Sequence, residues 1–173
     1  MKINKKDIPL DQFIDFALYD KVNGYYMKKN PFGKEGDFIT APSITRLFSE
    51  IIAIWVLTFW KSIGSPKKFN LLELGAGNGE MMKVIIETLK NFPECFLNCN
   101  FQIHEKSEIL KKKQQLSLKS EKITWIKDIK INNSFPTIFL ANEFFDALPI
   151  KQFFKKKEVW VERFVDLKDE KKS

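Results

Sequence analysis

The sequence predicts an α/β fold, in which a doubly wound and mostly parallel sheet follows an N-terminal helical segment. From residue 69 onward, short apolar runs of strand length alternate with longer segments of helical spacing. Three glycines, Gly75, Gly77 and Gly79, separate the first apolar run from the helical segment that follows it. Strands that alternate with helices pair in parallel through right-handed crossovers, so these observations favour this class.

The first part of the chain is expected to be helical. Leu10–Tyr19 has apolar residues at helical spacing, whereas residues 25–40 carry glycines and a proline that indicate a loop or short strand. Pro42 then opens a long helix that ends at residues 64–66. This helix has a broad apolar stripe and is expected to be covered on most sides; the stripe contains Ile44, Leu47, Phe48, Ile51, Ile52, Trp55 and Phe59.

The second part of the chain supplies the sheet. Helices are expected over residues 81–89 and 109–118. Each of the expected strands is a short apolar run; they are residues 69–74, 101–105, 123–126 and 136–140, with residues 159–165 as a fifth candidate.

Composition and charge exclude several classes of protein. With 44% hydrophobic and 14% aromatic residues, the chain is too apolar to be disordered. The formal net charge is +7, but Arg46 and Arg163 are the only arginines. Arginine is the residue that bidentate phosphate and guanine recognition prefers, so we expect no nucleic-acid partner.

The cysteines and the apolar runs exclude further classes of protein. Cys95, Cys99 and a single histidine, His104, exclude a disulfide framework and predict no metal site, because structural zinc needs about four ligands. The most apolar run, residues 51–60, is shorter than the ~20 residues that span a bilayer, and the charged start lacks a signal-peptide core. We therefore expect a cytoplasmic protein without membrane insertion.

The glycine loop at residues 75–79 predicts a cofactor site. Glycines allow a sharp turn and close contact with a ligand, and the start of the next helix presents free N–H groups. A dinucleotide fingerprint needs its third glycine one residue later, where this chain has the acidic Glu80, a poor neighbour for a pyrophosphate. The pattern therefore suits S-adenosylmethionine, a cationic cofactor, better than NAD. The predicted contacts are Glu73, Gly75, Ala76, Gly77 and Gly79.

Two further carboxylates follow predicted strands. Glu105 closes the second strand, where an acidic residue can accept hydrogen bonds from both ribose hydroxyls of a nucleotide. Asp128 follows the third strand, where the adenine would lie. Either residue can also be a solvated carboxylate at the end of a strand, and for Asp128 both interpretations stay open.

At the fourth strand, Asn142 and Glu143 lie at the carboxyl end, where ligands bind in open α/β sheets. Glu143 and Asp146 are three residues apart and would share a face of a helix. Two carboxylates suit a guanidinium group, which they can bind and from which they can accept a proton. The alternative is that Asp146 caps a helix and Glu143 holds a neighbouring loop.

Three segments of the chain resemble the MidA-type family of class I methyltransferases, which includes the mitochondrial arginine methyltransferase that helps to assemble respiratory complex I. The first runs from residues 24–26 through FGKEGDFITAP at residues 32–42 into residues 47–50 and Trp55. The second is the glycine loop, and the third is ANEFFDALP at residues 141–149. The first and third segments are specific to this family, whereas the loop marks only the wider superfamily.

The resemblance implies a Rossmann-like class I fold with strand order 3-2-1-4-5-7-6, of which the first four strands are present. Members of the family are about twice as long, so the chain is expected to be the N-terminal half of such an enzyme, incomplete at its C-terminal end, with an exposed strand edge. The implied domains are residues 1–66, a helical segment with a cofactor-covering loop, and residues 67–173, part of the domain that binds S-adenosylmethionine. Gly36 and Thr40 in the covering loop are expected to contact the cofactor, although Thr40 also suits a helix cap.

The implied activity is methyl transfer from S-adenosylmethionine to arginine of a protein substrate, such as a respiratory complex I subunit. Asn142, Glu143 and Asp146 would then be the catalytic residues. Eukaryotic relatives of this kind work in the mitochondrial matrix. The alternative is a truncated, non-catalytic module that binds the cofactor or a protein partner during assembly.

Overall fold

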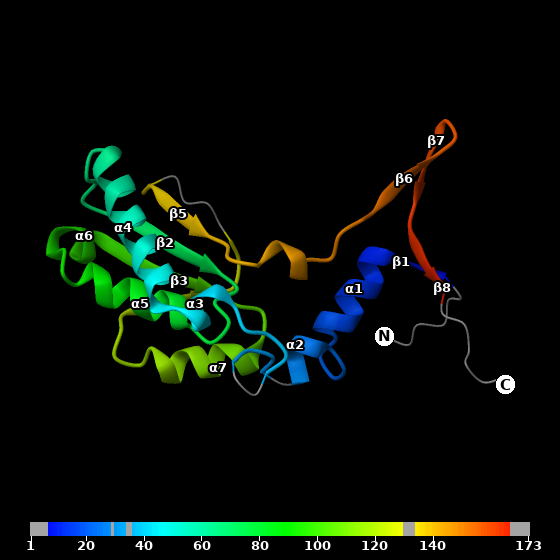
Figure 1. Cartoon of the computed structure of the whole chain (residues 1–173), viewed down its shortest axis with the longest axis horizontal. Helices are drawn as coiled ribbons and strands as arrows, with labels where there is room; N and C mark the ends of the chain where they lie inside the picture. The colour runs from blue at the N-terminus through cyan, green and yellow to red at the C-terminus, as the bar shows by residue number, and fades with distance from the viewer. Residues whose placement is uncertain (1–6, 29, 34–35, 130–133, 167–173) are drawn as a thin grey trace. The chain divides into compact units, whose positions relative to one another are not determined.

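The computed structural model describes residues 7–28, 30–33, 36–129 and 134–166 and groups them into two compact units (Figure 1). One unit runs from Asn30 to Phe144, and the other combines the residues before and after it. This grouping differs from the expected division after residue 66, and that division into domains stays a prediction. Lys34 and Glu35 of the expected covering loop, and the charged tail beyond residue 166, lie outside the described residues.

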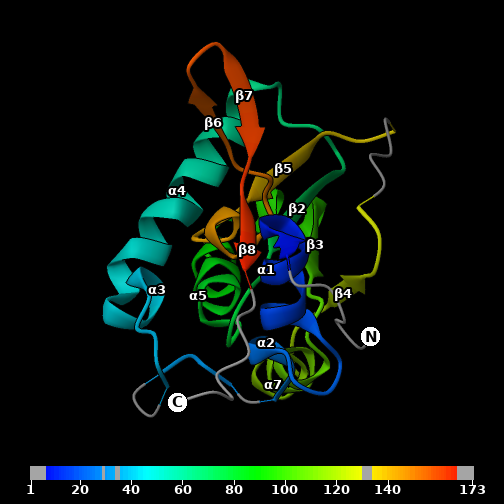
Figure 2. The same cartoon turned by 90° about the vertical axis from the view of Figure 1, so that its right-hand side faces the viewer.

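A parallel four-stranded sheet forms the centre of the unit at residues 30–144 (Figure 1, Figure 2). Its strand order is β4-β3-β2-β5, which is the 3-2-1-4 order expected for the first four strands, so the predicted fold class is confirmed. The strands are β2 (Phe69–Leu74), β3 (Cys99–His104), β4 (Ile123–Ile126) and β5 (Thr137–Leu140).

The central strand, β2, is buried almost along its whole length because it pairs with β3 on one side and β5 on the other. Leu72 lies opposite Gln102 of β3 and Phe139 of β5. Among the described residues β5 pairs with no other strand, and Phe139 is 42% exposed. The carboxyl ends of β2, β3 and β5 therefore meet at one edge of the sheet, where the candidate residues lie.

The helices of this unit are α3 (Ala41–Ile44), α4 (Arg46–Ser62), α5 (Glu80–Leu89), α6 (Pro93–Asn98) and α7 (Glu108–Ser117). The expected single helix from Pro42 is broken at Thr45, whose backbone is extended with φ −146° and ψ 130°. The Thr45 hydroxyl accepts a hydrogen bond of 3.3 Å from the backbone N–H of Leu47, so Thr45 caps α4. Thr40 precedes α3 and makes no capping bond with its side chain.

The buried face of α4 differs from the predicted stripe. The buried residues of α4 are Ser49, Ala53, Val56, Leu57 and Trp60, of which the four apolar ones belong to the core shared with α5 and the sheet. Figure 2 shows α4 and α5 on the same side of the sheet. Members of the predicted stripe remain exposed, among them Leu47, Ile51, Trp55 and Phe59. The prediction was wrong because α4 is apolar on nearly all sides, so hydrophobic spacing could not choose between its faces.

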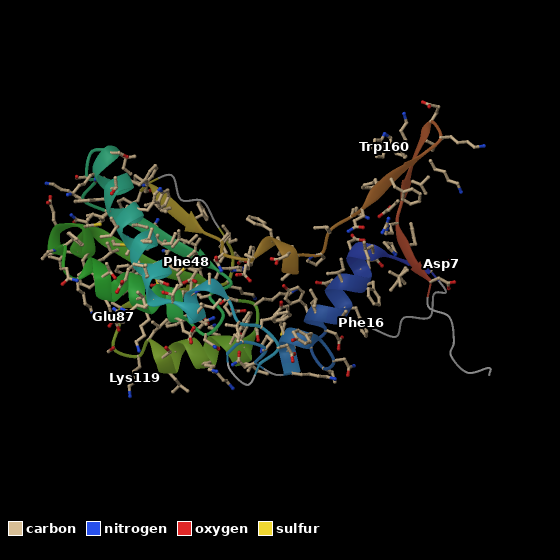
Figure 3. The ribbon with its side chains drawn as sticks, viewed as in Figure 1. Asp7, Phe16, Phe48, Glu87, Lys119 and Trp160 are labelled. Carbon is tan, nitrogen blue, oxygen red and sulfur yellow. The ribbon has the colours of Figure 1, made fainter. Side chains whose placement is uncertain are left out.

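The other unit contains the short strand β1 (Asp7–Pro9), helices α1 (Leu10–Tyr19) and α2 (Tyr25–Lys28), the 3-10 helix η1 (Phe145–Ala147) and strands β6 (Phe153–Lys156), β7 (Val159–Glu162) and β8 (Phe164–Asp166). The fifth candidate, residues 159–165, forms parts of two strands and not one, and neither strand joins the parallel sheet. β6 and β7 form an antiparallel hairpin, and β8 pairs with β1. On β7, Trp160 is 67% exposed (Figure 3). The hydroxyl of Tyr19 donates a hydrogen bond of 2.9 Å to the carbonyl of Ala147, which joins α1 to η1.

Candidate functional site

The glycine loop connects the end of β2 to the start of α5. Gly75, Gly77 and Gly79 have φ values of 67°, 53° and 80°, in the left-handed region that side chains disfavour. The loop is fixed at both ends, since the N–H of Gly75 donates to the carbonyl of His104 and that of Gly79 donates to the carbonyl of Ala76. The loop thus directs its backbone toward the carboxyl edge of the sheet.

A cavity beside this loop brings together seven of the predicted site residues. These residues are Thr40, Glu73, Gly75, Ala76, Gly77, Asn142 and Glu143. The sequence did not single out the other lining residues as contacts; they are Phe32, Pro42, Ser43, Asn78, Glu80 and Met81. Segments from residues 32–43, 73–81 and 142–143 therefore converge on one place.

The cavity is acidic. Glu73, Glu80 and Glu143 line it, and none of its lining residues is lysine or arginine. The hydroxyl of Ser43 donates a hydrogen bond to Glu80, which joins α3 to the start of α5. A cavity lined with carboxylates and without a cationic side chain favours a positively charged ligand.

Glu73 is the most unusual of these carboxylates. It is 3% exposed, and its Oε2 atom has no hydrogen-bond partner within the described part of the chain. Burial raises the pKa of Glu73 from 4.5 to about 8, helped by the negative charge of Glu105 and opposed by a hydrogen bond from the backbone of Met82. An ammonium group in the cavity would donate the missing hydrogen bond, and any cation there would lower this pKa, so the residues present fit a ligand that carries ammonium and sulfonium groups.

Replacing Glu73 with glutamine is expected to change how stability depends on pH. Because the pKa of Glu73 is raised in the folded state, the unfolded chain loses this proton near pH 4.5 and the folded chain near pH 8. The stability of the wild type should therefore fall as the pH rises between these values, and Glu73→Gln should remove a penalty on the order of 3 kcal/mol at pH 8. Thermal unfolding at pH 5 and pH 8 measures this, and parallel pH profiles for both proteins would contradict it.

Phe144 covers the first glycine of the loop. A Cβ atom on Gly75 would lie 2.8 Å from Cδ2 of the Phe144 ring, and the φ of 67° adds backbone strain. We expect Gly75→Ala to lower the free energy of unfolding by about 2 kcal/mol. Chemical denaturation checks this value, and Gly75→Ala combined with Phe144→Leu should recover part of the loss. No recovery would show that the ring is not the obstacle.

Glu105 lies directly after β3 and accepts hydrogen bonds from Ser107, Gln114 and the backbone of Lys106. Its Oε1 atom accepts from the backbone N–H of Ser107 at 2.9 Å, and its Oε2 atom accepts from the Gln114 side chain at 3.0 Å. Burial is the main cause of its raised pKa. Glu105 is not among the residues that line the acidic cavity, but Gln114 connects it to the glycine loop.

The structure places other predicted residues apart from this cavity. Asp128 is exposed beyond the end of β4, and Gly79 packs against Leu118 and Gln114. Gly36 lines a second hollow, which shares Phe32, Asn78 and Glu80 with the cavity. The expected shared helix face was wrong, because Glu143 lies in a turn with φ 50° whereas Asp146 lies in η1, which begins at Phe145. That the two carboxylates act together stays a prediction.

Glu143 has the backbone of a strained residue. Its φ is 50°, in the left-handed region, and it follows β5 directly after Asn142. The Asn142 amide donates a hydrogen bond of 3.4 Å to the Glu143 carboxylate. Non-glycine residues in this region cost on the order of 1–3 kcal/mol and cluster at functional sites.

The fold is that of a Rossmann-like domain, and the acidic cavity beside its glycine loop suits a cationic ligand. The chain belongs to the family described as "Putative S-adenosyl-L-methionine-dependent methyltransferase", which matches residues 51–173. The family resemblance found in the sequence is therefore confirmed, and S-adenosylmethionine is the cofactor that the family description names.

Curated relatives carry more specific names. The protein arginine methyltransferase NDUFAF7, mitochondrial, of Homo sapiens is 30% identical over 184 residues, which cover 92% of this chain and 42% of that protein. The Drosophila melanogaster homolog is 32% identical, and the match covers 92% of this chain and 41% of that protein. The chain thus spans less than half the length of the curated relatives that it matches.

A solved structure has the same fold. It is a COG1565 superfamily member from Burkholderia thailandensis bound to S-adenosyl-homocysteine, with a TM-score of 0.78 and 24% sequence identity. The match covers 95% of this chain and 43% of that one. Among the described residues, no helix is both long enough and apolar enough to cross a membrane.

Proposed function

We propose that this chain binds S-adenosylmethionine against the glycine loop and takes part in methyl transfer to arginine of a protein substrate. The observation that carries the proposal is the buried Glu73 carboxylate, with one oxygen lacking a partner among the described residues, in a cavity lined by three glutamates. The bound cofactor supplies an activated methyl group on a sulfonium. Glu73 would hold positive charge beside the loop, and Glu105 would bind the ribose hydroxyls.

The acceptor is proposed to enter beside Glu143. A guanidinium that gains a methyl group must lose a proton as the new C–N bond forms and the C–S bond breaks, and Glu143 would accept that proton. The strained backbone of Glu143 and its bond from Asn142 support a fixed orientation for this task. Asp146 is proposed to assist. The choice of arginine rests on the names of the curated relatives, and a respiratory complex I subunit as the substrate stays a prediction.

A second candidate function is a non-catalytic module that engages a protein partner. It is favoured by an exposed apolar face of α4, on which Trp55 and Phe59 stack with ring centroids 5.5 Å apart. Leu47 and Ile51 extend this face and are each 58% exposed. Apolar patches of this kind mark interaction surfaces.

Calorimetry with S-adenosylhomocysteine, followed by transfer of a labelled methyl group, tests the proposal and separates the two candidates. The acceptors are a set of peptides that contain arginine and a matched set in which lysine replaces it. Binding together with labelling of the arginine peptides alone is the expected result. Binding without labelling of any peptide would favour the non-catalytic module, and absence of binding would overturn the cofactor site itself.

A further inference from the structure

Gln114 is a polar residue at a fully buried position of α7. Its exposed fraction is 0%, and Leu110, one turn earlier on α7, is also buried. An unpartnered amide would be costly there, because burial removes its hydrogen bonds to water. The position requires an explanation, since an apolar side chain is the usual choice on the buried face of a helix.

The side chain of Gln114 bonds to three different elements. Its Nε2 atom donates to the carbonyl of Gly77 and to Oε2 of Glu105, both at 3.0 Å. Its Oε1 atom accepts a bond of 3.0 Å from the indole N–H of Trp125 on β4. One amide thus connects the glycine loop, the carboxylate after β3 and the neighbouring strand, and uses both of its donor hydrogens.

These bonds fix the Glu105 carboxylate but leave it able to accept a further hydrogen bond. Ser107 occupies one lone pair of Oε1 and Gln114 one lone pair of Oε2. The backbone N–H of Lys106 is a third donor to this carboxylate. Because a carboxylate has about four lone-pair sites, one remains to accept a hydrogen bond from a ribose hydroxyl. The bond from Gln114 to Gly77 also sets the loop relative to that carboxylate.

We propose that Gln114 is a positioning residue that aligns Glu105 with the glycine loop, so that the site recognises the ribose of its cofactor. This inference rests on the proposed function, because it assumes that S-adenosylmethionine binds at the loop. An amide is required at this position. Glutamate would place a second carboxylate against Glu105, and methionine would keep the volume but lose both donors.

The test measures discrimination between riboses rather than activity. Calorimetry gives the affinities of the wild type, Gln114→Met and Gln114→Glu for S-adenosylhomocysteine and for its 2′-deoxy analogue. The wild type should prefer the ribose form about tenfold, as one hydrogen bond to a charged group provides. Both variants should lose most of this preference while they bind the deoxy analogue nearly as well as the wild type does.

Trp125→Phe is the matched control, because it removes one bond of the same network but leaves both donors of Gln114 in place. It should keep the preference for ribose. In addition, the double variant Glu105→Gln/Gln114→Met should prefer the ribose form over the 2′-deoxy analogue as much as Glu105→Gln alone does, because Gln114 acts through Glu105. An unchanged preference in folded Gln114 variants would overturn the inference, whereas failure of the wild type to bind S-adenosylhomocysteine would overturn the proposed function beneath it.

If the variants do not fold, an NMR measurement on the unaltered chain tests whether Gln114 takes part in ribose recognition. The side-chain amide signals of Gln114 in the NMR spectrum should exchange slowly and should move when adenosine is added. Methionine, which lacks the ribose, should leave them in place. Gln114 amide signals that do not shift at adenosine concentrations where adenosine binds would contradict the proposal.

Discussion

Replacing Gly77 with valine is expected to weaken the binding of S-adenosylhomocysteine at least 100-fold. The φ of 53° is strongly unfavourable for a β-branched residue. A Cβ atom at this position would lie 3.6 Å from the Phe32 ring, so the two methyl groups would extend into the ring or into the space beside the loop. Calorimetry measures the affinity, and circular dichroism shows whether the variant remains folded.

Gly64 provides the matched control for this experiment. Its φ of 88° gives valine a similar backbone penalty, but a Cβ atom there would meet nothing within 4 Å, and the residue follows α4 outside the cavity lining. Gly64→Val should therefore lower stability and leave the affinity unchanged. Equal affinities for Gly77→Val and Gly64→Val would place the ligand away from the loop.

Replacing Glu143 with glutamine is expected to reduce the rate of methyl transfer about 100-fold and to change the affinity for S-adenosylhomocysteine less than twofold. Glutamine keeps the size of the side chain but cannot accept a proton from the guanidinium, and general-base catalysis commonly contributes 100-fold or more. Single-turnover transfer to an arginine peptide measures the rate, and calorimetry measures the affinity.

The control for this variant is Glu94→Gln, which removes a carboxylate from the exposed start of α6. It should leave both the rate and the affinity unchanged. A parallel loss of affinity and rate in Glu143→Gln would make Glu143 a structural residue of the cavity. An unchanged rate would remove it from the proposed proton transfer.

The central part of the fold was predictable because its signals are local. The strand at Phe69–Leu74 lies between a proline-containing turn and the glycine loop, and the helices after it have clear spacing. The segment at residues 159–165 does form strands, but outside the parallel sheet, because a short apolar run does not reveal whether its partner is parallel or antiparallel. In the structure the strand partner of Val159–Glu162 is the adjacent β6.

The candidate site was predictable to the extent that it lies in contiguous motifs. Glu73 and the glycines stand within seven residues of one another, and Glu143 directly follows a strand. Gln114 was missed because it is 37 residues from Gly77 and sits in a helix that is otherwise rich in lysine. Phe32 and Ser43 were missed because their approach to the loop depends on how the segment before α4 folds back.

The central position of β2 has a consequence for how this fold can diversify. The carboxylate proposed to read the ribose follows β3, on one side of β2, whereas the residues proposed to face the acceptor follow β5, on the other side. Substitutions after β5 can therefore alter the side that faces the acceptor while the carboxylate after β3 keeps its place beside the ribose.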